Sequence, residues 1–182
     1  MNIWHDINPE HIRKDAYTAV VTNTQGSTAG LAFDGETGLL RLQYLSDTGM
    51  GIPFNTAMIP RTCTPTGAPI ESILLCNHPI PQMTLAECRP VGLVLVRLTD
   101  GKQRVLLLSA VDADEFLGGC MTVEEIPSVN RRSIIRWLRH EHQLLRSPAR
   151  SVSFAGIQQA EQWLESCRKT YLTRFCGVLP RD

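Results

Sequence analysis

Two adjacent side chains in this sequence, Glu141 and His142, have the chemistry for acid–base work. Carboxylates bind Mg²⁺ or transfer protons, and an imidazole titrates near neutral pH. Glu141 and His142 are adjacent in an expected helix, so a solvated helix face is an equally simple interpretation of this pair. His140 precedes them, but residues two apart on a helix point about 200° apart, so His140 and His142 are not expected to chelate one metal.

A basic segment surrounds this pair, with Glu141 as its one acidic residue. Its members are Arg131, Arg132, Arg136, Arg139, Arg146 and Arg150. Arginine suits phosphate and carboxylate recognition, so the segment is either a solvated helix face or a contact for a phosphorylated ligand or nucleic acid. No aromatic-rich RNA-binding motif or zinc finger accompanies it, and nucleic acid is therefore not an expected partner.

The cysteines offer one further candidate. The chain has six of them, scattered and without a CxxC pair, which predicts free thiols rather than disulfides or a zinc site. Cys63 is a nucleophile if a base lies near it, and otherwise a buried, inert thiol.

Apolar runs of strand length occupy the first two thirds of the chain. They cover residues 16–22, 39–45, 70–76, 91–98 and 104–111. Gly- and Pro-rich turns separate them, which predicts a β-barrel or β-sandwich.

The last third has helical periodicity. A helix is expected to begin at Pro127-Ser128, and Ile134 and Leu138 fall on its apolar face. A second helix is expected to begin near Ser153. Its apolar stripe comprises Ile157, Ala160, Leu164, Cys167 and Tyr171.

Composition describes an ordinary globular protein. The 182 residues are 43% hydrophobic and 20% charged, with a formal net charge of zero, so charge favours neither nucleic acid nor membrane. A single domain over residues 1–182 is expected. The polar first fifteen residues and the short apolar runs predict a cytoplasmic protein with no membrane partner.

Several short segments carry a resemblance to a known family. They are MNIWHDINP (1–9), ETGLL (36–40), PFN (53–55), IPRT (59–62) and RPVG (89–92). In these segments the chain resembles the soluble inorganic pyrophosphatases of family I, over residues 1 to about 176. The resemblance implies an α+β, mostly β fold: a closed, OB-like β-barrel with two C-terminal helices packed against it. It also implies a homo-oligomer.

The resemblance implies a hydrolase that uses Mg²⁺ ions held by carboxylates, with cationic side chains and tyrosines on the phosphates. This sequence departs from that pattern at most of the positions concerned. The family's acidic metal ligands fall on Thr22, Ala32, Thr66, Ala68 and Glu71. Only Glu71 remains acidic, and Asp100 is the one carboxylate in the later, shifted metal loop.

The phosphate-binding positions have changed as well. By the resemblance, the family's first lysine falls on Gly30, its arginine on Tyr44, and its Tyr-Lys pair on Glu141 and His142. The family's two tyrosines that flank Asn55 become Ile52 and Thr56, and Arg104 takes the place of another lysine. Mostly small or neutral side chains therefore surround a less charged cavity.

Four arginines accompany the strands that frame this cavity in the family: Arg61, Arg89, Arg97 and Arg104. Two or more of them pointing inward would favour an anionic ligand. If they lie outside, the cavity is close to neutral.

These departures lead to a functional hypothesis: a degenerate pyrophosphatase-like protein whose cavity binds or transforms a small molecule, anionic or neutral, without two-metal hydrolysis. The candidate catalytic residues are Glu71, Glu141 and His142, and no metal is expected unless Glu71 and Asp100 bind Mg²⁺. The candidate ligand-binding residues are Tyr44, Asn55, Thr56, Arg61, Thr66 and Arg104. Two alternatives remain: a non-catalytic scaffold or regulatory protein, and a weak Mg²⁺-dependent diphosphatase.

Overall fold

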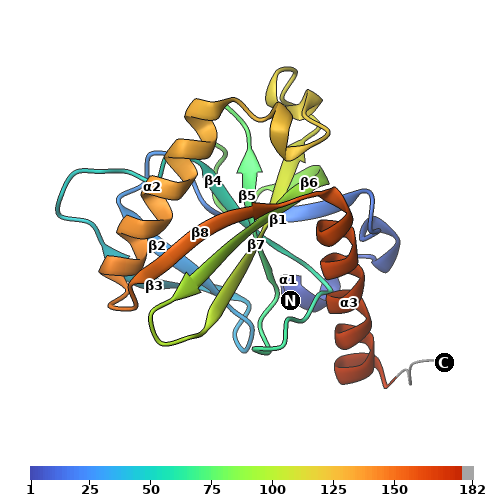
Figure 1. The fold of residues 1–182 in the computed structure, drawn as a ribbon. Coiled ribbons are helices and arrows are strands. Elements are labelled where there is room, and N and C mark those ends of the chain that lie inside the picture. Colours follow the sequence, from blue (N-terminus) through green and yellow to red (C-terminus); the bar gives the residue numbers. More distant parts are fainter. Residues whose placement is uncertain (178–182) are drawn as a thin grey trace.

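The computed structural model describes residues 1–177, which form eight strands and three α-helices (Figure 1). The strands are β1 (Tyr17–Asn23), β2 (Ala29–Asp34), β3 (Leu39–Leu45), β4 (Asn55–Ile59), β5 (Ile70–Leu75), β6 (Leu85–Leu98), β7 (Gln103–Val111) and β8 (Ala149–Ala155). The α-helices are α1 (Ile3–Asp6), α2 (Ser128–Leu144) and α3 (Ile157–Cys176). Three short 3₁₀ turns are η1 (Pro9–His11), η2 (Leu117–Gly119) and η3 (Val123–Glu125).

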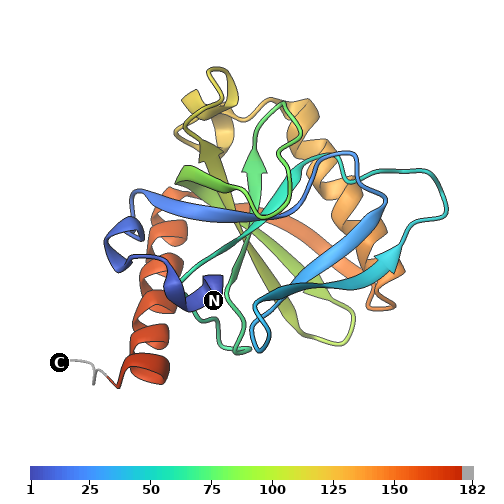
Figure 2. The same ribbon diagram turned by 180° about the vertical axis from the view of Figure 1, so that it is seen from behind.

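Five strands close into a barrel. The strand order is β1-β4-β5-β7-β6-β8, and an additional β1–β6 pairing joins the first strand to the fifth. Closure leaves these strands without an open edge. The β5–β7 pair is parallel, while β8 extends the sheet antiparallel to β6. β2 and β3 form a separate antiparallel hairpin, which projects on the side of α2 (Figure 2).

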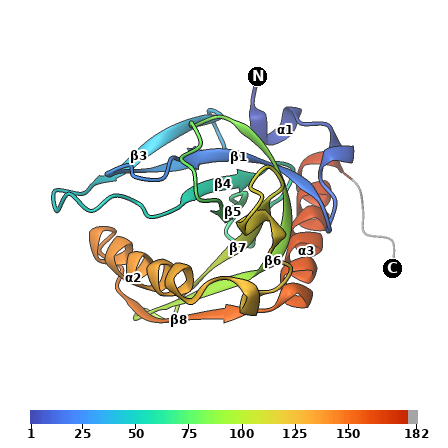
Figure 3. The same cartoon turned by 90° about the horizontal axis from the view of Figure 1, so that it is seen from above.

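The two long helices lie on opposite sides of the barrel (Figures 1 and 3). Successive side chains of a strand point to opposite faces, so each strand between the helices serves two apolar clusters. On β7, Leu106 packs in the cluster that contains Trp137 of α2, whereas Leu107 packs in the cluster that contains Leu164 of α3. Neither helix is long and apolar enough, within the described residues, to cross a membrane.

The predicted fold class is confirmed, and the apolar runs form β1, β3, β5, β6 and β7. The helix expected from Pro127-Ser128 is α2, which begins at Ser128.

The second helix does not begin near Ser153. That residue lies in β8, and α3 begins only at Ile157. Strand pairing explains the difference, because Val152 and Phe154 lie opposite Val96 and Val94 of β6. Alternating apolar side chains that pair with a long neighbouring strand favour the extended backbone. Strands β2 and β4 were also not predicted from the sequence.

A chain of buried hydroxyl groups crosses the barrel interior. The hydroxyl of Tyr17 on β1 lies 2.6 Å from Oγ of Ser109 on β7, which lies 2.6 Å from Oγ of Ser72 on β5. Ser72 also donates to the carbonyl of Leu107 at 3.0 Å. All three hydroxyl-bearing residues are buried. β1 is not paired with β7, so these bonds link strands that the sheet itself does not join.

Replacing Ser109 with alanine is expected to lower the free energy of unfolding by about 1–3 kcal/mol, because the buried Tyr17 hydroxyl loses its partner. Urea unfolding followed by far-UV circular dichroism measures this change. The double variant Ser109→Ala/Tyr17→Phe should lose less than the sum of the two single variants. Strict additivity would contradict the proposed link.

Candidate functional site

A cleft of about 300 Å³ lies between the barrel, the β2–β3 hairpin and α2. Its polar lining includes Thr22, Asn23, Thr56, Glu71, Arg104 and Glu141. β1, β4, β5 and β7 supply the barrel wall, and α2 supplies Glu141. The cleft therefore brings together several of the replaced positions, among them Thr22, Ala32, Thr56, Ala68 and Glu141.

Arg104 is the central side chain of this cleft. Its Nε and Nη2 donate to Glu71 Oε2 and Oε1 at 2.8 and 3.1 Å, and its Nη1 donates to Glu141 Oε2 at 2.7 Å. The guanidinium thus makes a two-pronged bond to β5 and a third bond to α2. The side chain of Arg104 is 21% exposed, whereas that of Glu71 is 47% exposed.

Tyr44 and His142 complete the cluster. The Tyr44 hydroxyl of β3 donates to Glu141 Oε1 at 3.0 Å. His142 is buried, with Nδ1 3.0 Å from the carbonyl oxygen of Ser147 and Nε2 3.3 Å from Arg104 Nη1. A carbonyl only accepts and a guanidinium only donates. Nδ1 therefore carries the proton and Nε2 accepts, which is the neutral form of the imidazole.

The pKa values of the cluster follow from burial and from Arg104. Burial acts to raise the pKa of Glu71, but the charge and hydrogen bonds of Arg104 outweigh it, so the pKa falls below its usual value. Burial, assisted by Arg104, lowers the pKa of His142. Burial and the neighbouring Glu141 carboxylate raise the pKa of Tyr44. The cluster at neutral pH is one guanidinium, two carboxylates, a neutral imidazole and a phenol.

A neutral network lines the part of the same barrel wall that β1 and β4 supply, beside β5. Thr22 Oγ1 lies 2.9 Å from Thr56 Oγ1, and Asn23 Nδ2 donates to Thr56 Oγ1 at 2.8 Å. The Asn23 side chain also pairs with the backbone N–H and C=O of Leu31, both at 2.8 Å. Thr22 and Thr56 were singled out by the resemblance. Asn23 was not, although its position next to Thr22 on β1 is a signal that sequence reasoning could have used.

Other predicted site residues lie elsewhere. Asn55 is buried, accepts from the backbone of Gln25 and Ile80 and donates to the backbone of His78, so it holds loops together. The Arg61 guanidinium donates to the Ile7 carbonyl.

Two candidates lie at some remove from the central cluster. Thr66 lines a neighbouring pocket, and Asp100 pairs with Lys102 at 3.5 Å in the β6–β7 turn. None of Asn55, Arg61, Thr66 and Asp100 lines the cleft.

The arginines of the barrel decide the charge of the cleft. Arg89 donates to the carbonyl oxygens of Gly118 and Cys120, and Arg97 is exposed on β6. Arg61 points toward α1, which leaves Arg104 as the one arginine that lines the cleft within residues 1–177. The condition for an anionic ligand, two inward arginines, is not met.

The replacements Gly30 and Tyr44 are coupled. They lie opposite each other in the β2–β3 hairpin, and a Cβ on residue 30 would overlap the Tyr44 ring. The family's lysine and arginine fall on these two positions by the resemblance. A side chain longer than hydrogen at residue 30 is incompatible with the place that Tyr44 takes beside Glu141.

His140 and Cys63 do not join the cleft. His140 packs edge-on against Trp137, with ring centroids 5.4 Å apart, and lines a groove with Arg132, Arg136 and Arg139. Cys63 is fully buried and its thiol donates to the Thr64 carbonyl at 3.6 Å.

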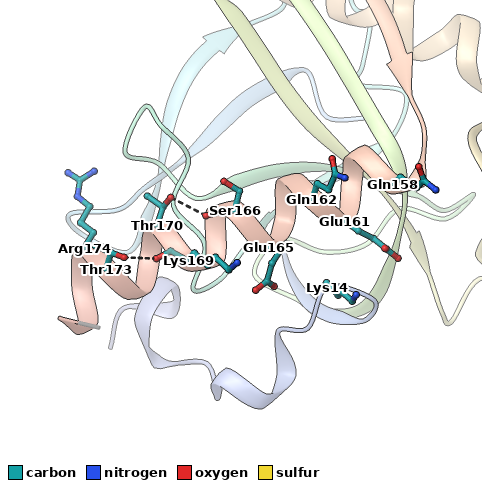
Figure 4. A pocket seen from close by; sticks show the side chains of 10 residues that line it. All are labelled: Lys14, Gln158, Glu161, Gln162, Glu165, Ser166, Lys169, Thr170, Thr173 and Arg174. Atoms are coloured by element: carbon teal, nitrogen blue, oxygen red, sulfur yellow. Dashed lines mark hydrogen bonds between the residues drawn. The ribbon is translucent and has the colours of Figure 1, made fainter. Parts of the chain in front are cut away.

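A surface groove of about 1000 Å³ runs along α3 and contains none of the predicted site residues (Figure 4). Charges of both signs line it, including Lys14 and Glu161. The hydroxyls of Thr170 and Thr173 donate to carbonyls of their own helix at 3.0 Å. The groove therefore has the character of a solvated helix face.

Replacing Gly30 with alanine should lower the free energy of unfolding by about 1–3 kcal/mol, because the new methyl group displaces the Tyr44 ring. Thermal unfolding measures the loss. Gly119→Ala is the matched control, since a Cβ there meets nothing within 4 Å. Gly30→Ala should become nearly neutral in a Tyr44→Ala background. An undiminished loss in that background would count against the coupling.

Stability should also depend on pH through His142. Its folded-state pKa lies below the ordinary 6.5, so the unfolded chain binds this proton more readily. The free energy of unfolding is therefore lost as the pH falls from about 6.5, by at most about 1.4 kcal/mol per pH unit for one proton. The lowered pKa of Glu71 adds a loss of the same sign only below its ordinary 4.5.

Denaturant unfolding between about pH 7 and pH 5 compares the chain with a His142→Gln variant, which does not titrate at this position. The variant should show the smaller slope. Equal slopes would mean that His142 does not hold a lowered pKa.

The comparisons with known proteins agree with the barrel and its helices. The model of the inorganic pyrophosphatase family matches residues 19–172. The chain is 22% identical over 157 residues to the inorganic pyrophosphatase of Sulfolobus acidocaldarius, covering 86% of this chain and 90% of that one. It is 23% identical to the enzyme of Aquifex pyrophilus, with 91% and 93% covered.

Solved structures give the same result for the fold. The inorganic pyrophosphatase of Thermus thermophilus superposes with a TM-score of 0.80 at 18% identity, covering 94% of this chain and 99% of that one. The Helicobacter pylori enzyme has the same TM-score of 0.80 at 16% identity, with 91% and 98% covered. With its match over residues 19–172 and a barrel of this topology, the chain belongs to the inorganic pyrophosphatase family.

Proposed function

We propose that this member of the family uses its cleft to bind a small, uncharged polar molecule and does not hydrolyse diphosphate by a two-metal route. The observation that carries the proposal is the position of Arg104 between Glu71 and Glu141, at 2.7–3.1 Å from their oxygens. The guanidinium of Arg104, with its single positive charge, thus lies between the two carboxylates of the cleft.

The donor set does not suit Mg²⁺. Mg²⁺ requires oxygen ligands in near-octahedral geometry, and catalytic pairs of ions need several carboxylates. Within residues 1–177 no group of three or more His, Cys, Asp or Glu side chains is arranged to hold a metal ion. Both carboxylates of the cleft already bind the Arg104 guanidinium, whose charge repels a divalent ion at the same place.

The charge of the cluster disfavours diphosphate. Arg104 contributes +1 and the carboxylates of Glu71 and Glu141 contribute −2, so with neutral His142 the cluster carries −1. Diphosphate recognition needs cations and donors in excess of acceptors. On the neighbouring strands β1 and β4, Thr22, Asn23 and Thr56 supply hydroxyl and amide groups, which suit a neutral ligand with hydroxyl or amide groups.

Binding is favoured over catalysis because the acid–base candidates are already engaged. Glu141 accepts from Arg104 and from Tyr44, and Nε2 of His142 accepts from Arg104. Glu71, with its side chain 47% exposed, is the member of the cluster most open to a ligand. Tyr44, Thr56 and Arg104 then bind or position the ligand, and a homo-oligomer remains part of the proposal.

A weak Mg²⁺-dependent diphosphatase is the second candidate. Relatives that match about nine tenths of this chain are named inorganic pyrophosphatases, which favours it. A scaffold without a small ligand is the third, and the open cleft of about 300 Å³ argues against it.

Phosphate release from diphosphate, measured at micromolar protein with Mg²⁺, with Mn²⁺ and with chelator, tests the proposal. We expect no release above the buffer blank, because Arg104 already binds both carboxylates of the cleft, and the lining formed by residues 1–177 holds no further cation for the diphosphate. Metal-dependent release that disappears in Glu71→Gln would establish the second candidate instead.

Thermal unfolding with and without Mn²⁺ gives the matched control. The unchanged chain should melt at the same temperature in both conditions, because Arg104 neutralises the carboxylates. Arg104→Ala should be destabilised by about 1–3 kcal/mol, since it leaves the part-buried carboxylates of Glu71 and Glu141 without a cation, and solvent around the 47% exposed Glu71 side chain limits the loss. Mn²⁺ should restore part of that loss by mass action. A rise in the melting temperature of the unchanged chain with Mn²⁺ would contradict the proposal.

A further inference from the structure

A second pocket of about 380 Å³ lies directly beside the cleft. Its own lining includes Thr64, Pro65, Thr66, Gln103, Val105 and Trp163, and we name it the Trp163 pocket. It shares Glu71 and Arg104 with the cleft. The ion pair between these two residues is therefore a common wall of both spaces.

The geometry of β7 explains why the two spaces differ in character. Side chains alternate between the faces of a strand. Leu106 lines the cleft, Gln103 and Val105 line the Trp163 pocket, and Arg104 lies in the lining of both. Beyond the shared Glu71 and Arg104, the lining of the Trp163 pocket is uncharged.

Most side chains that line the Trp163 pocket are uncharged, and one of them is the planar indole of Trp163. Pro65, Val105 and the indole of Trp163 offer apolar contacts. At the rim, the hydroxyls of Thr64 and Thr66 form a hydrogen bond with each other at 2.8 Å, so they do not need a polar group of a ligand as a partner. Such walls suit a planar apolar group that packs against the indole.

Trp163 adds an independent observation. Its Nε1 is buried and has no hydrogen-bond partner among residues 1–177. A buried indole N–H usually has one, and leaving such a donor unpaired is costly. Because this nitrogen is not accessible to solvent, an acceptor reaches it only when the Trp163 side chain shifts, as the packing of a ligand against the indole would allow.

We infer that the Trp163 pocket is a second subsite, so that the ligand has a neutral polar head in the cleft and a planar apolar arm against Trp163. The inference rests on the proposed function, because the cleft must bind the head. The 47% exposed side chain of Glu71 lies where head and arm meet. The ligand class is then an aryl amide, aryl alcohol or similar compound rather than a small sugar or an inorganic anion.

Two probe compounds separate the subsites: acetamide, which has only the head, and benzamide, which has head and arm. Titrations followed by ¹H–¹⁵N NMR report on both spaces, and Trp163→Phe identifies the Trp163 indole signal among the three tryptophans. Benzamide should shift this signal and the Glu71 amide, and bind about tenfold more tightly than acetamide. Acetamide should shift the Glu71 and Thr56 amides only.

Filling the pocket provides the decisive variant. Thr66 is exposed at the rim, so Thr66→Tyr should fold normally and remove the advantage of benzamide while acetamide still binds. Thr48→Tyr, at an exposed threonine of the β3–β4 loop, is the matched control and should leave both affinities unchanged.

The outcomes distinguish this inference from the proposed function. Equal affinities for the two probes, or a benzamide advantage that survives Thr66→Tyr, would overturn the second subsite while acetamide binding in the cleft still supports the proposed function. If neither probe shifts the Glu71 and Thr56 amides, both are overturned.

Discussion

The Arg104 guanidinium is the interaction on which the cleft depends. It joins Glu71 of β5 to Glu141 of α2, and Glu141 in turn accepts from Tyr44 of β3. Barrel, helix and hairpin therefore meet at one ion cluster. A half-buried ion pair contributes little net stability when it is complete, but loss of one partner leaves an uncompensated charge. Replacing Arg104, Glu71 or Glu141 alone is therefore expected to cost more stability than replacing all three together with uncharged residues.

Several residues that differ from the family's pattern around this cluster depend on one another. Hydrogen at residue 30 leaves room for the Tyr44 ring, and Tyr44 satisfies the second oxygen of Glu141. Thr22 and Thr56, at positions where the resemblance placed a charged and a phenolic group, bond to each other, and Asn23 donates to Thr56. The neutral wall and the ion cluster each satisfy their own hydrogen bonds, as a stable polar site without a metal requires.

The family fold tolerates such changes because one of its apolar cores is directed away from the cleft, while Leu106 of the core beside α2 adjoins it. The cluster around Leu107 and Leu164 and the hydroxyl chain from Tyr17 to Ser72 lie on the opposite face of β5 and β7 from Glu71 and Arg104. The strands keep their packing while the residues that face the cleft change. The fold agrees with that of the Thermus thermophilus enzyme at a TM-score of 0.80, although the identity is only 18%.

The sequence by itself determined a β-rich fold and the first long helix, because apolar runs and turn residues act locally. Its short motifs indicated the family, and only that resemblance favoured a barrel over a sandwich. It did not determine β2, β4 and β8, whose short or mixed sequences become strands only by pairing with neighbours such as β6. It named Glu71, Arg104, Glu141 and His142, but not their association. Arg104 is separated from its two carboxylates by 33 and 37 residues, and only the packing of α2 and β5 against β7 brings them together. Tertiary structure also decided that Arg61, Arg89 and Arg97 lie outside the cleft, because the direction of a side chain depends on the register of its strand or loop and not on its type.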